Sequence, residues 1–182
     1  MAFSFFGGIH PKENKHTRDV PVLAFPEPDI VVIPMSQHIG IPCKPLVKKN
    51  DYVKKGQKIG DNTGLCVPIH ASVSGTVKKI DLQLMANGKK GTVVVIESDG
   101  LMTPDPSIKP PAIESFADLS AAARAAGLVG LGGAGFPTSV KLDSGKLDVL
   151  DTLVLNGAEC EPYITSDTRT MLDKADEIRK GI

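Results

Sequence analysis

The sequence has few large aromatic residues and no long apolar run. Its 182 residues include no tryptophan, two tyrosines and six phenylalanines, so a core must be built from Val, Ile, Leu and Ala. The uncharged stretch 125–140 holds five glycines and falls short of the ~20 apolar residues of a membrane-spanning helix. The first residues lack the basic start and long apolar stretch of a secretory signal. We therefore expect no transmembrane segment and a chain that stays on the cytosolic side.

Cysteine is also scarce. The three cysteines, Cys43, Cys66 and Cys160, are 23 and 94 residues apart and form no Cys-x-x-Cys pair. An odd count argues against a disulfide framework, and the four histidines show no metal-ligand spacing. The spacing therefore predicts no iron–sulfur or structural zinc site within this chain.

Net charge is zero, but the charges are unevenly distributed. Residues 1–109 carry 14 basic against 10 acidic side chains, and residues 110–182 carry 7 against 11. The change coincides with a proline-rich stretch, 103–112, which predicts an extended connector between two domains. The 18 glycines and 14 prolines favour turns between short strands.

The first half is typical of a small, mostly antiparallel β unit. Short β-branched runs are separated by turn residues, and Asn87-Gly88 suits a tight reversal. The expected strands are Ile30–Ile33, Lys44–Val47, Val53, Lys58–Ile59, Ser74–Ile80 and Thr92–Ile96. Ten lysines on this unit could dock an acidic partner or lipid headgroups, but we favour solvated lysines that block edge-to-edge pairing.

The second half changes to an α/β pattern. Ser115 and Asp118 predict the capped start of a helix over 116–126, which Gly127 ends. A glycine-rich loop follows, and Pro137 suits the first turn of a next helix that carries Lys141. Such a loop lets a ligand approach the backbone and is typical of an anion cradle, although tight turns need the same residue.

An apolar strand over 152–155 is expected to run into the polar turn Asn156-Gly-Ala-Glu-Cys-Glu-Pro-Tyr163. Ligands of open α/β sheets bind at such carboxyl ends. Ionised Glu159 and Glu161 can only accept hydrogen bonds, which suits ribose or ribityl hydroxyls. The alternative is a solvated loop before a single helix, capped by Ser166 or Asp167 and continuing through Arg179, with Met171, Leu172, Ala175 and Ile178 on its inner face.

Two segments resemble the biotinyl and lipoyl carrier family, whose fold is a barrel-sandwich hybrid. They are Asn50–Ile59 and Pro68–Val77. Carriers place a lysine at the hairpin tip between these segments, and residues 60–67 contain none. The resemblance therefore implies the fold without the carrier function, as in a structural or docking module.

Further motifs resemble two related families. Gly130-Leu-Gly-Gly-Ala-Gly-Phe-Pro-Thr-x-x-Lys141 with Asn156-x-x-Glu-x-Glu-Pro162 is similar to the flavin-binding subunit of respiratory complex I. Phe6–Pro11 and Ile33–Gly40 resemble the C subunits of the Rnf ion-translocating electron transport complex. Leu131 and Ala158 depart from the arginine and aspartate often found in complex I relatives.

This resemblance implies an α+β, multi-domain chain. A biotinyl/lipoyl-like barrel-sandwich hybrid is followed by the first part of an α/β FMN-binding domain. The implied divisions are an N-terminal segment 1–28, the barrel-sandwich domain 29–102, the linker 103–112, and part of an FMN/NADH-binding domain like the complex I 51 kDa subunit, 113–182.

The resemblance also implies the cofactors and their residues. The positions that match the family's FMN site are Gly130, Gly132, Gly133, Lys141, Asn156 and Glu159, and Phe136 and Glu161 lie toward NAD(H). Hydride passes between nicotinamide and flavin, so no residue here is expected to be a catalytic acid or base. The 4Fe-4S clusters of the family are expected in a C-terminal part beyond this chain.

The implied function is that of a peripheral, cytoplasmic-side subunit of a membrane-bound ferredoxin:NAD oxidoreductase coupled to ion translocation. Its partners are the other Rnf membrane subunits and, indirectly, ferredoxin, and the fragment alone is expected to be inactive. Two alternatives stay open: a non-catalytic docking module, and a cobalamin-reductase-type flavoprotein that shares the motifs. Nucleic-acid binding is disfavoured because the lysine-rich half has almost no interleaved aromatics.

Overall fold

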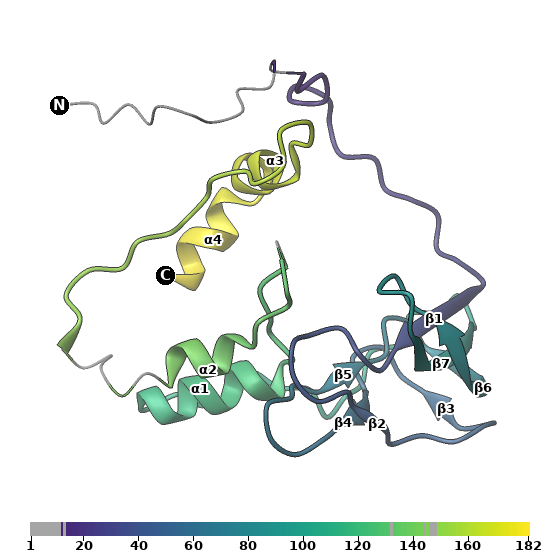
Figure 1. Ribbon diagram of the computed structural model, residues 1–182. Helices are drawn as coiled ribbons and strands as arrows, with labels where there is room; N and C mark the ends of the chain where they lie inside the picture. Colours follow the sequence, from purple (N-terminus) through teal and green to yellow (C-terminus); the bar gives the residue numbers. More distant parts are fainter. Residues whose placement is uncertain (1–11, 13, 132, 144, 146–148) are drawn as a thin grey trace, which may run out of the picture. The chain divides into compact units, whose positions relative to one another are not determined.

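The computed structural model describes residues 12, 14–131, 133–143, 145 and 149–182 (Figure 1). The chain divides into two compact units. One is Pro26–Asp151, and the other combines Met1–Phe25 with Thr152–Ile182. Each unit is described separately below.

The larger unit contains two antiparallel sheets. The four-stranded sheet has the order β1-β7-β6-β3, and the three-stranded sheet has the order β2-β4-β5 (Figure 1). The strands are β1 (Ile30–Pro34), β2 (Lys44–Pro45), β3 (Tyr52–Val53), β4 (Lys58–Asp61), β5 (Ile69–His70), β6 (Gly75–Leu84) and β7 (Lys90–Ser98).

Small aliphatic side chains fill the core of this unit, as the lack of large aromatics requires. Val53, Ile59, Val77 and Ile96 are fully buried. Burial of each such side chain contributes roughly 1.5–3 kcal/mol. Strand β7 lies between β1 and β6, and its run of four buried residues, 93–96, explains why this segment is continuously apolar.

Each strand predicted in the first half of the chain overlaps an observed one, and the reversal at Asn87-Gly88 is confirmed because Gly88 has φ +76° between β6 and β7. Strand β5 was not predicted. It is two residues long, and only its antiparallel pairing with β4 makes it a strand. A segment this short carries no periodicity in the sequence.

Helix α1 (Phe116–Ala125) begins as predicted. The Ser115 hydroxyl accepts a hydrogen bond from Asp118 N at 3.2 Å and donates to the Asp118 carboxylate at 2.7 Å. Gly127, with φ +70°, follows the end of the helix in the left-handed conformation that favours glycine.

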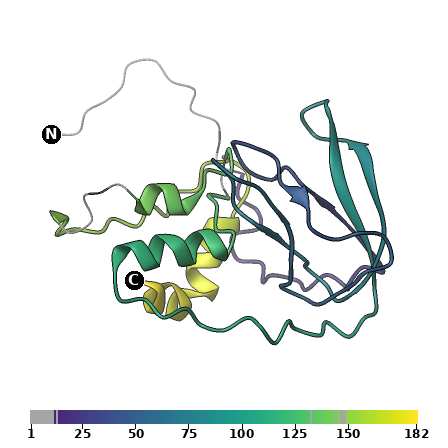
Figure 2. The same ribbon diagram turned by 90° about the horizontal axis from the view of Figure 1, so that it is seen from below.

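The connector from β7 to α1 is extended, as expected from its prolines (Figure 2). It is also fixed to the barrel. Lys55 N donates to Thr103 O and Asp105 N donates to Lys55 O, both at 2.9 Å, beside the parallel bridge between Lys55 and Pro104.

The smaller unit corrects two sequence-based predictions. The single helix expected through Arg179 is two helices, α3 (Ser166–Asp173) and α4 (Ala175–Gly181), because Lys174 has the non-helical ψ of 22°. Neither helix has a buried residue among those described, and Leu172 on the expected inner face is 63% exposed. The 3.6-residue pattern is present, but the described segments leave its apolar face largely exposed.

The strand predicted over 152–155 is also wrong. These residues form no strand, and Val154 is 81% exposed. A strand requires a neighbouring strand for its backbone hydrogen bonds, and no described strand pairs with this segment. In the described part of the chain, no helix is long and apolar enough to cross a membrane.

Candidate functional site

The glycine-rich loop lies between α1 and α2 (Thr138–Leu142) in the larger unit. Its base is closed by two backbone hydrogen bonds, from Gly130 N to Phe136 O at 3.0 Å and from Thr138 N to Leu128 O at 2.9 Å. Residues 131 and 133–136 therefore form the tip of a short antiparallel turn. Gly132 lies outside the described residues.

The barrel supports one side of this loop. Gly135 has φ +66°, and a Cβ built there would lie 2.7 Å from Gln37 O. Gly135 O in turn accepts a hydrogen bond from Ile39 N at 3.3 Å. A Cβ on Gly127 would lie 2.5 Å from Pro68 O. Gly127 and Gly135 are thus required where the loop packs against the barrel backbone.

The other side of the loop is open. A Cβ built on Gly133 meets no atom of the described residues within 4 Å, and Leu131 is 93% exposed. The Lys141 ammonium lies 5.8 Å from the centre of the Phe136 ring, and 3.8 Å from a Cβ built on Gly130. The structure therefore brings Gly130, Phe136 and Lys141 together, and it leaves Gly133 accessible.

The backbone amides of the loop tip add to this open face. Those of residues 133–136 donate to no described residue. Uncommitted amides beside a lysine can bind an anion or the carbonyl oxygens of a heterocycle. The helix that follows has five residues, with Pro137 before its first turn, so its dipole adds little.

The acidic turn lies in the smaller unit. Asn156 Oδ1 accepts a hydrogen bond from Ala158 N at 3.1 Å, which makes a local turn. The Glu159 carboxylate accepts from Asp167 N at 2.9 Å and Thr168 N at 3.2 Å. Glu159 therefore caps α3, in place of Ser166 or Asp167.

The pKa shifts of the two carboxylates at this cap agree with a capping role for Glu159. Desolvation acts to raise the pKa of Glu159, but hydrogen bonds from Thr168 and Asp167 outweigh it and lower the pKa. The nearby Glu159 charge raises the pKa of Asp167. The Glu161 side chain is exposed, and its backbone oxygen accepts from Lys15 Nζ at 3.4 Å.

The predicted site residues thus fall into two groups. Gly130, Gly133, Phe136 and Lys141 belong to the larger unit, while Asn156, Glu159 and Glu161 belong to the smaller one. The joining of the two groups around one ligand stays a prediction.

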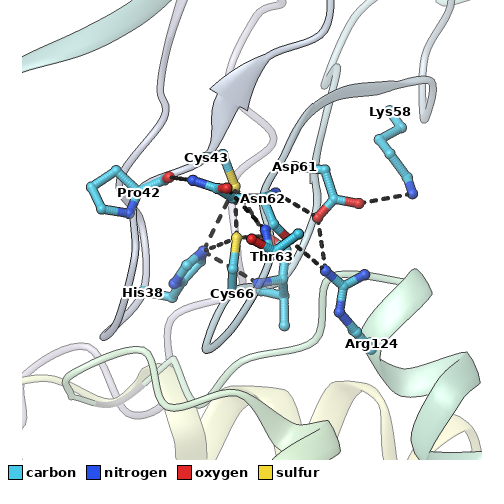
Figure 3. Close-up of polar contacts among 10 residues, drawn as sticks. His38, Pro42, Cys43, Lys58, Asp61, Asn62, Thr63, Cys66 and Arg124 are labelled. Atoms are coloured by element: carbon cyan, nitrogen blue, oxygen red, sulfur yellow. Dashed lines mark hydrogen bonds and ion pairs between the residues drawn. The ribbon is translucent and has the colours of Figure 1, made fainter.

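An ion pair joins α1 to the barrel within the larger unit. Arg124 donates to Asp61 Oδ1 at 2.9 Å and to Asn62 O at 3.0 Å, and Lys58 donates to the other carboxylate oxygen (Figure 3). Burial acts to raise the pKa of Asp61, but hydrogen bonds from Arg124, Asn62 and Lys58 lower it overall. This pair fixes the helix that precedes the glycine loop.

A second cluster was not expected from the sequence. Figure 3 shows His38, Cys43 and Cys66 converging at the edge of the barrel core. Both thiols are buried, and burial, followed by the neighbouring Cys66, raises the pKa of Cys43 to about 12. The two cysteines are 23 residues apart and meet because β2 pairs with β4 and because Ile41 N donates to Leu65 O. A fold assignment for residues 34–67, unlike residue spacing, could have revealed the cluster.

Taken together, these features are those of a small barrel of two antiparallel sheets that supports an open, glycine-rich, cation-bearing loop. Comparison with known families agrees. Residues 3–101 match the RnfC barrel sandwich hybrid domain, and residues 123–182 match the Nuo51 FMN-binding domain. The chain belongs to the RnfC family. The barrel-sandwich part of the predicted fold is thereby confirmed, while closer likeness to biotinyl and lipoyl carriers stays a prediction.

Individual relatives cover the whole chain. It is 48% identical to the C subunit of the Na⁺-translocating ferredoxin:NAD⁺ oxidoreductase complex of Acetobacterium woodii, over 98% of the chain and 42% of that protein. It is 41% identical to the C subunit of the proton-translocating ferredoxin:NAD⁺ oxidoreductase complex of Clostridium ljungdahlii, over 100% of the chain and 41% of that protein.

A third relative is the C subunit of the ion-translocating oxidoreductase complex of Rhodobacter capsulatus. It is 41% identical over 100% of the chain and 36% of its own length. The chain therefore spans less than half the length of these relatives.

Proposed function

We propose that this chain forms the N-terminal part of a peripheral electron-transfer subunit in a membrane-bound ferredoxin:NAD oxidoreductase coupled to ion translocation. The observation that carries the proposal is the open glycine-rich loop beside Lys141, within a segment that matches an FMN-binding domain. The names of the relatives supply the reaction, and the loop supplies a place for the flavin.

The loop residues fit the chemistry of FMN. Gly133 leaves room for a planar ring or a phosphate against the backbone, and Lys141 provides a positive charge for phosphate or ring oxygens. Phe136 offers an apolar surface 38% exposed on the same loop. When bound, FMN would supply hydride exchange with NAD(H) and single-electron exchange with iron–sulfur clusters, and the protein residues would position it.

Fewer hydrogen-bonding groups on the acidic turn are free for a ligand than the sequence alone suggested. Both carboxylate oxygens of Glu159 already accept hydrogen bonds, one from two amides of α3 and the other from the Ser166 hydroxyl, and Asn156 is engaged in its own turn. Their remaining acceptor capacity still suits ribityl or ribose hydroxyls. Glu161, with its exposed side chain, is the better candidate for the dinucleotide.

We base the remaining parts of the proposal on the complexes to which the relatives belong. We assign the other subunits of the membrane complex as partners, ferredoxin as an indirect partner, and the cytoplasmic face of the membrane as the location. The 4Fe-4S clusters are assigned to the part of the relatives that extends beyond the region matched here.

Flavin analysis of the full-length subunit, purified with its membrane partners, tests the proposal. We expect FMN to co-purify and to be bleached by NADH under anaerobic conditions. A complex without flavin would overturn the electron-transfer assignment and favour a docking module. Flavin that NADH does not reduce, but that reduces cobalamin, would favour the cobalamin-reductase alternative.

A further inference from the structure

His38, Cys43 and Cys66 form a compact set of metal-binding groups at the barrel edge. Cys43 Sγ lies 3.4 Å from Cys66 Sγ, and His38 Nε2 lies 3.8 Å and 3.7 Å from the two sulfur atoms (Figure 3). We propose that these three residues bind a zinc-class divalent ion, with the fourth position open to water. The proposal concerns the barrel and does not rest on the flavin assignment.

The distances agree with tetrahedral coordination. With zinc–sulfur bonds of about 2.3 Å and a zinc–nitrogen bond of about 2.0 Å, ligand atoms lie about 3.8 Å apart for two sulfurs and about 3.5 Å apart for sulfur and nitrogen. The three observed separations each lie within about 0.4 Å of these values. A disulfide would instead require the two sulfur atoms to approach to about 2.05 Å.

The orientation of His38 is that of a metal ligand. Its Nδ1 lies 3.1 Å from the carbonyl oxygen of Ile39, which can only accept, so Nδ1 carries the proton. Nε2 is then unprotonated. It accepts a hydrogen bond from Val67 N at 3.4 Å and lies beside the two sulfur atoms, so a metal ion would replace this amide as its partner. Zinc-binding histidines commonly donate their other N–H to a backbone carbonyl in this way.

The burial of the two cysteines also favours a bound divalent ion. Cys43 and Cys66 are 4% and 3% exposed, and a single buried charge would be costly there. A divalent ion with two thiolates and a neutral imidazole carries no net charge. Binding releases the two thiol protons to solvent, so the exchange balances without any oxidant.

A cavity borders His38, next to the proposed metal position. A cavity of about 200 Å³ lies beside His38 and Val67, and its lining includes Pro68, His70 and Gly127. The cavity borders His38 but neither cysteine, and water from it is the proposed fourth ligand. A zinc ion here would join the segment after β1 to the connection between β4 and β5.

The site has a structural consequence for the glycine loop. Gln37 and Ile39, on either side of His38, are residues that contact Gly135. A metal bound to His38 would therefore stiffen the platform on which the loop rests. Its role is that of a clamp, because the site is separate from the open face near Gly133.

Metal analysis of the 182-residue chain tests the site. The chain is purified under reducing conditions, loaded with Zn²⁺, desalted and measured by elemental mass spectrometry. We expect about one zinc per chain, and at least about tenfold less after Cys43→Ser or Cys66→Ser. Cys160→Ser is the matched control, since Cys160 is exposed and outside the cluster, and it should keep full occupancy.

Cobalt provides the second readout. Co²⁺ should give the visible bands of a tetrahedral ion together with thiolate charge-transfer absorption, both lost in the Cys66→Ser variant. Equal zinc content in all four proteins, or none in the wild type, would overturn the proposal. So would an intact mass lower by two hydrogens under non-reducing conditions that persists with zinc present, since this identifies a Cys43–Cys66 disulfide.

A chelator experiment on the wild-type chain tests the site even if the cysteine variants fail to fold. Removing zinc with a strong chelator should lower its thermal midpoint, and adding zinc back should restore it. The Cys160→Ser control should behave identically. A midpoint unchanged by the chelator, with zinc still removed, would contradict the clamp.

Discussion

At the scale of single residues, Gly133 and Gly135 differ in what a side chain would meet. Gly133 has open space around its Cβ position and no positive φ, so the protein itself tolerates a side chain there. We predict that Gly133→Val in the full-length subunit keeps the stability of the wild type but loses FMN, because the side chain occupies the ligand's approach. Fluorescence titration with FMN, alongside circular dichroism, measures both effects.

Gly135→Val is the contrasting variant. Its Cβ would lie 2.7 Å from a backbone oxygen, and its φ is +66°, so strain of about 1–3 kcal/mol should lower the free energy of unfolding.

For the first variant, normal FMN affinity in folded Gly133→Val would exclude a flavin placed against the loop tip.

Lys141 makes the second residue-scale prediction. Lys141→Ala in the full-length subunit should weaken FMN binding by about 1.5–3 kcal/mol, roughly 10-fold to 150-fold, because a charged hydrogen bond is lost. Equilibrium dialysis of the flavin provides the affinity. Lys141→Arg should retain most of it, and Lys79→Ala, on the exposed surface of β6, should have no effect. An unchanged affinity for Lys141→Ala would move the flavin away from this lysine.

At the scale of elements, the contact of α1 with the barrel depends on Arg124 and Asp61. Removal of this partly exposed pair should destabilise the larger unit by about 1 kcal/mol. A double-mutant cycle of Arg124→Gln and Asp61→Asn, followed by urea unfolding, measures the coupling. Arg179→Gln with Asp176→Asn, an exposed pair within α4, is the control and should show almost none. Zero coupling for the first pair would mean that apolar packing alone holds α1.

The connection between β4 and β5 makes a prediction about modification. Carriers attach biotin or lipoate to a lysine at this position, and residues 62–68 contain no lysine. We expect intact mass spectrometry of the protein from its native cells to show neither adduct. A biotin or lipoyl mass on any lysine would contradict the prediction, and a biotinylated carrier from the same cells serves as positive control.

At the scale of the molecule, the larger unit should lose stability in mild acid. Desolvation, followed by the charge of Lys58, lowers the pKa of His70 below its ordinary value of 6.5. The unfolded chain therefore binds this proton more readily. The contribution of His70 is complete above pH 6.5 and declines as the pH falls toward the lower folded value.

Urea unfolding between pH 8 and pH 5 measures this effect. The wild type should lose stability over this interval, and His70→Gln should reduce the slope. His16→Gln, which lies outside the larger unit, is the control and should leave the slope unchanged. Equal slopes in wild type and His70→Gln would show that His70 titrates normally.

The barrel and the helical segments of the larger unit form one platform for the glycine loop. Arg124 anchors α1, Gly127 packs on Pro68, and Gly135 packs on Gln37. Barrel residues thus hold the loop at Gly127 and Gly135 and leave Gly133 open. The barrel of this chain has no lysine at the carrier position, and support of the loop is a role that this packing gives it.

Patterns between near neighbours in the chain were enough to predict the local features. Alternating β-branched runs, the reversal at Gly88 and the cap at Ser115 all act over a few residues. The family followed from the same kind of signal, because the glycine loop and the Asn156 turn are continuous motifs. Where a pattern needed a distant partner, as for the strand over 152–155, the prediction was wrong.

Contacts between distant residues became known only from the folded chain. The fold separates Gly133, which a side chain could replace, from Gly135, which the barrel backbone requires, although the sequence presents them alike. In the folded chain the Glu159 carboxylate caps the start of α3. The fold also places His38 beside two cysteines that lie 23 residues apart in the sequence. Each outcome depends on strand pairing and backbone packing across the fold, and spacing along the chain contains no information about such contacts.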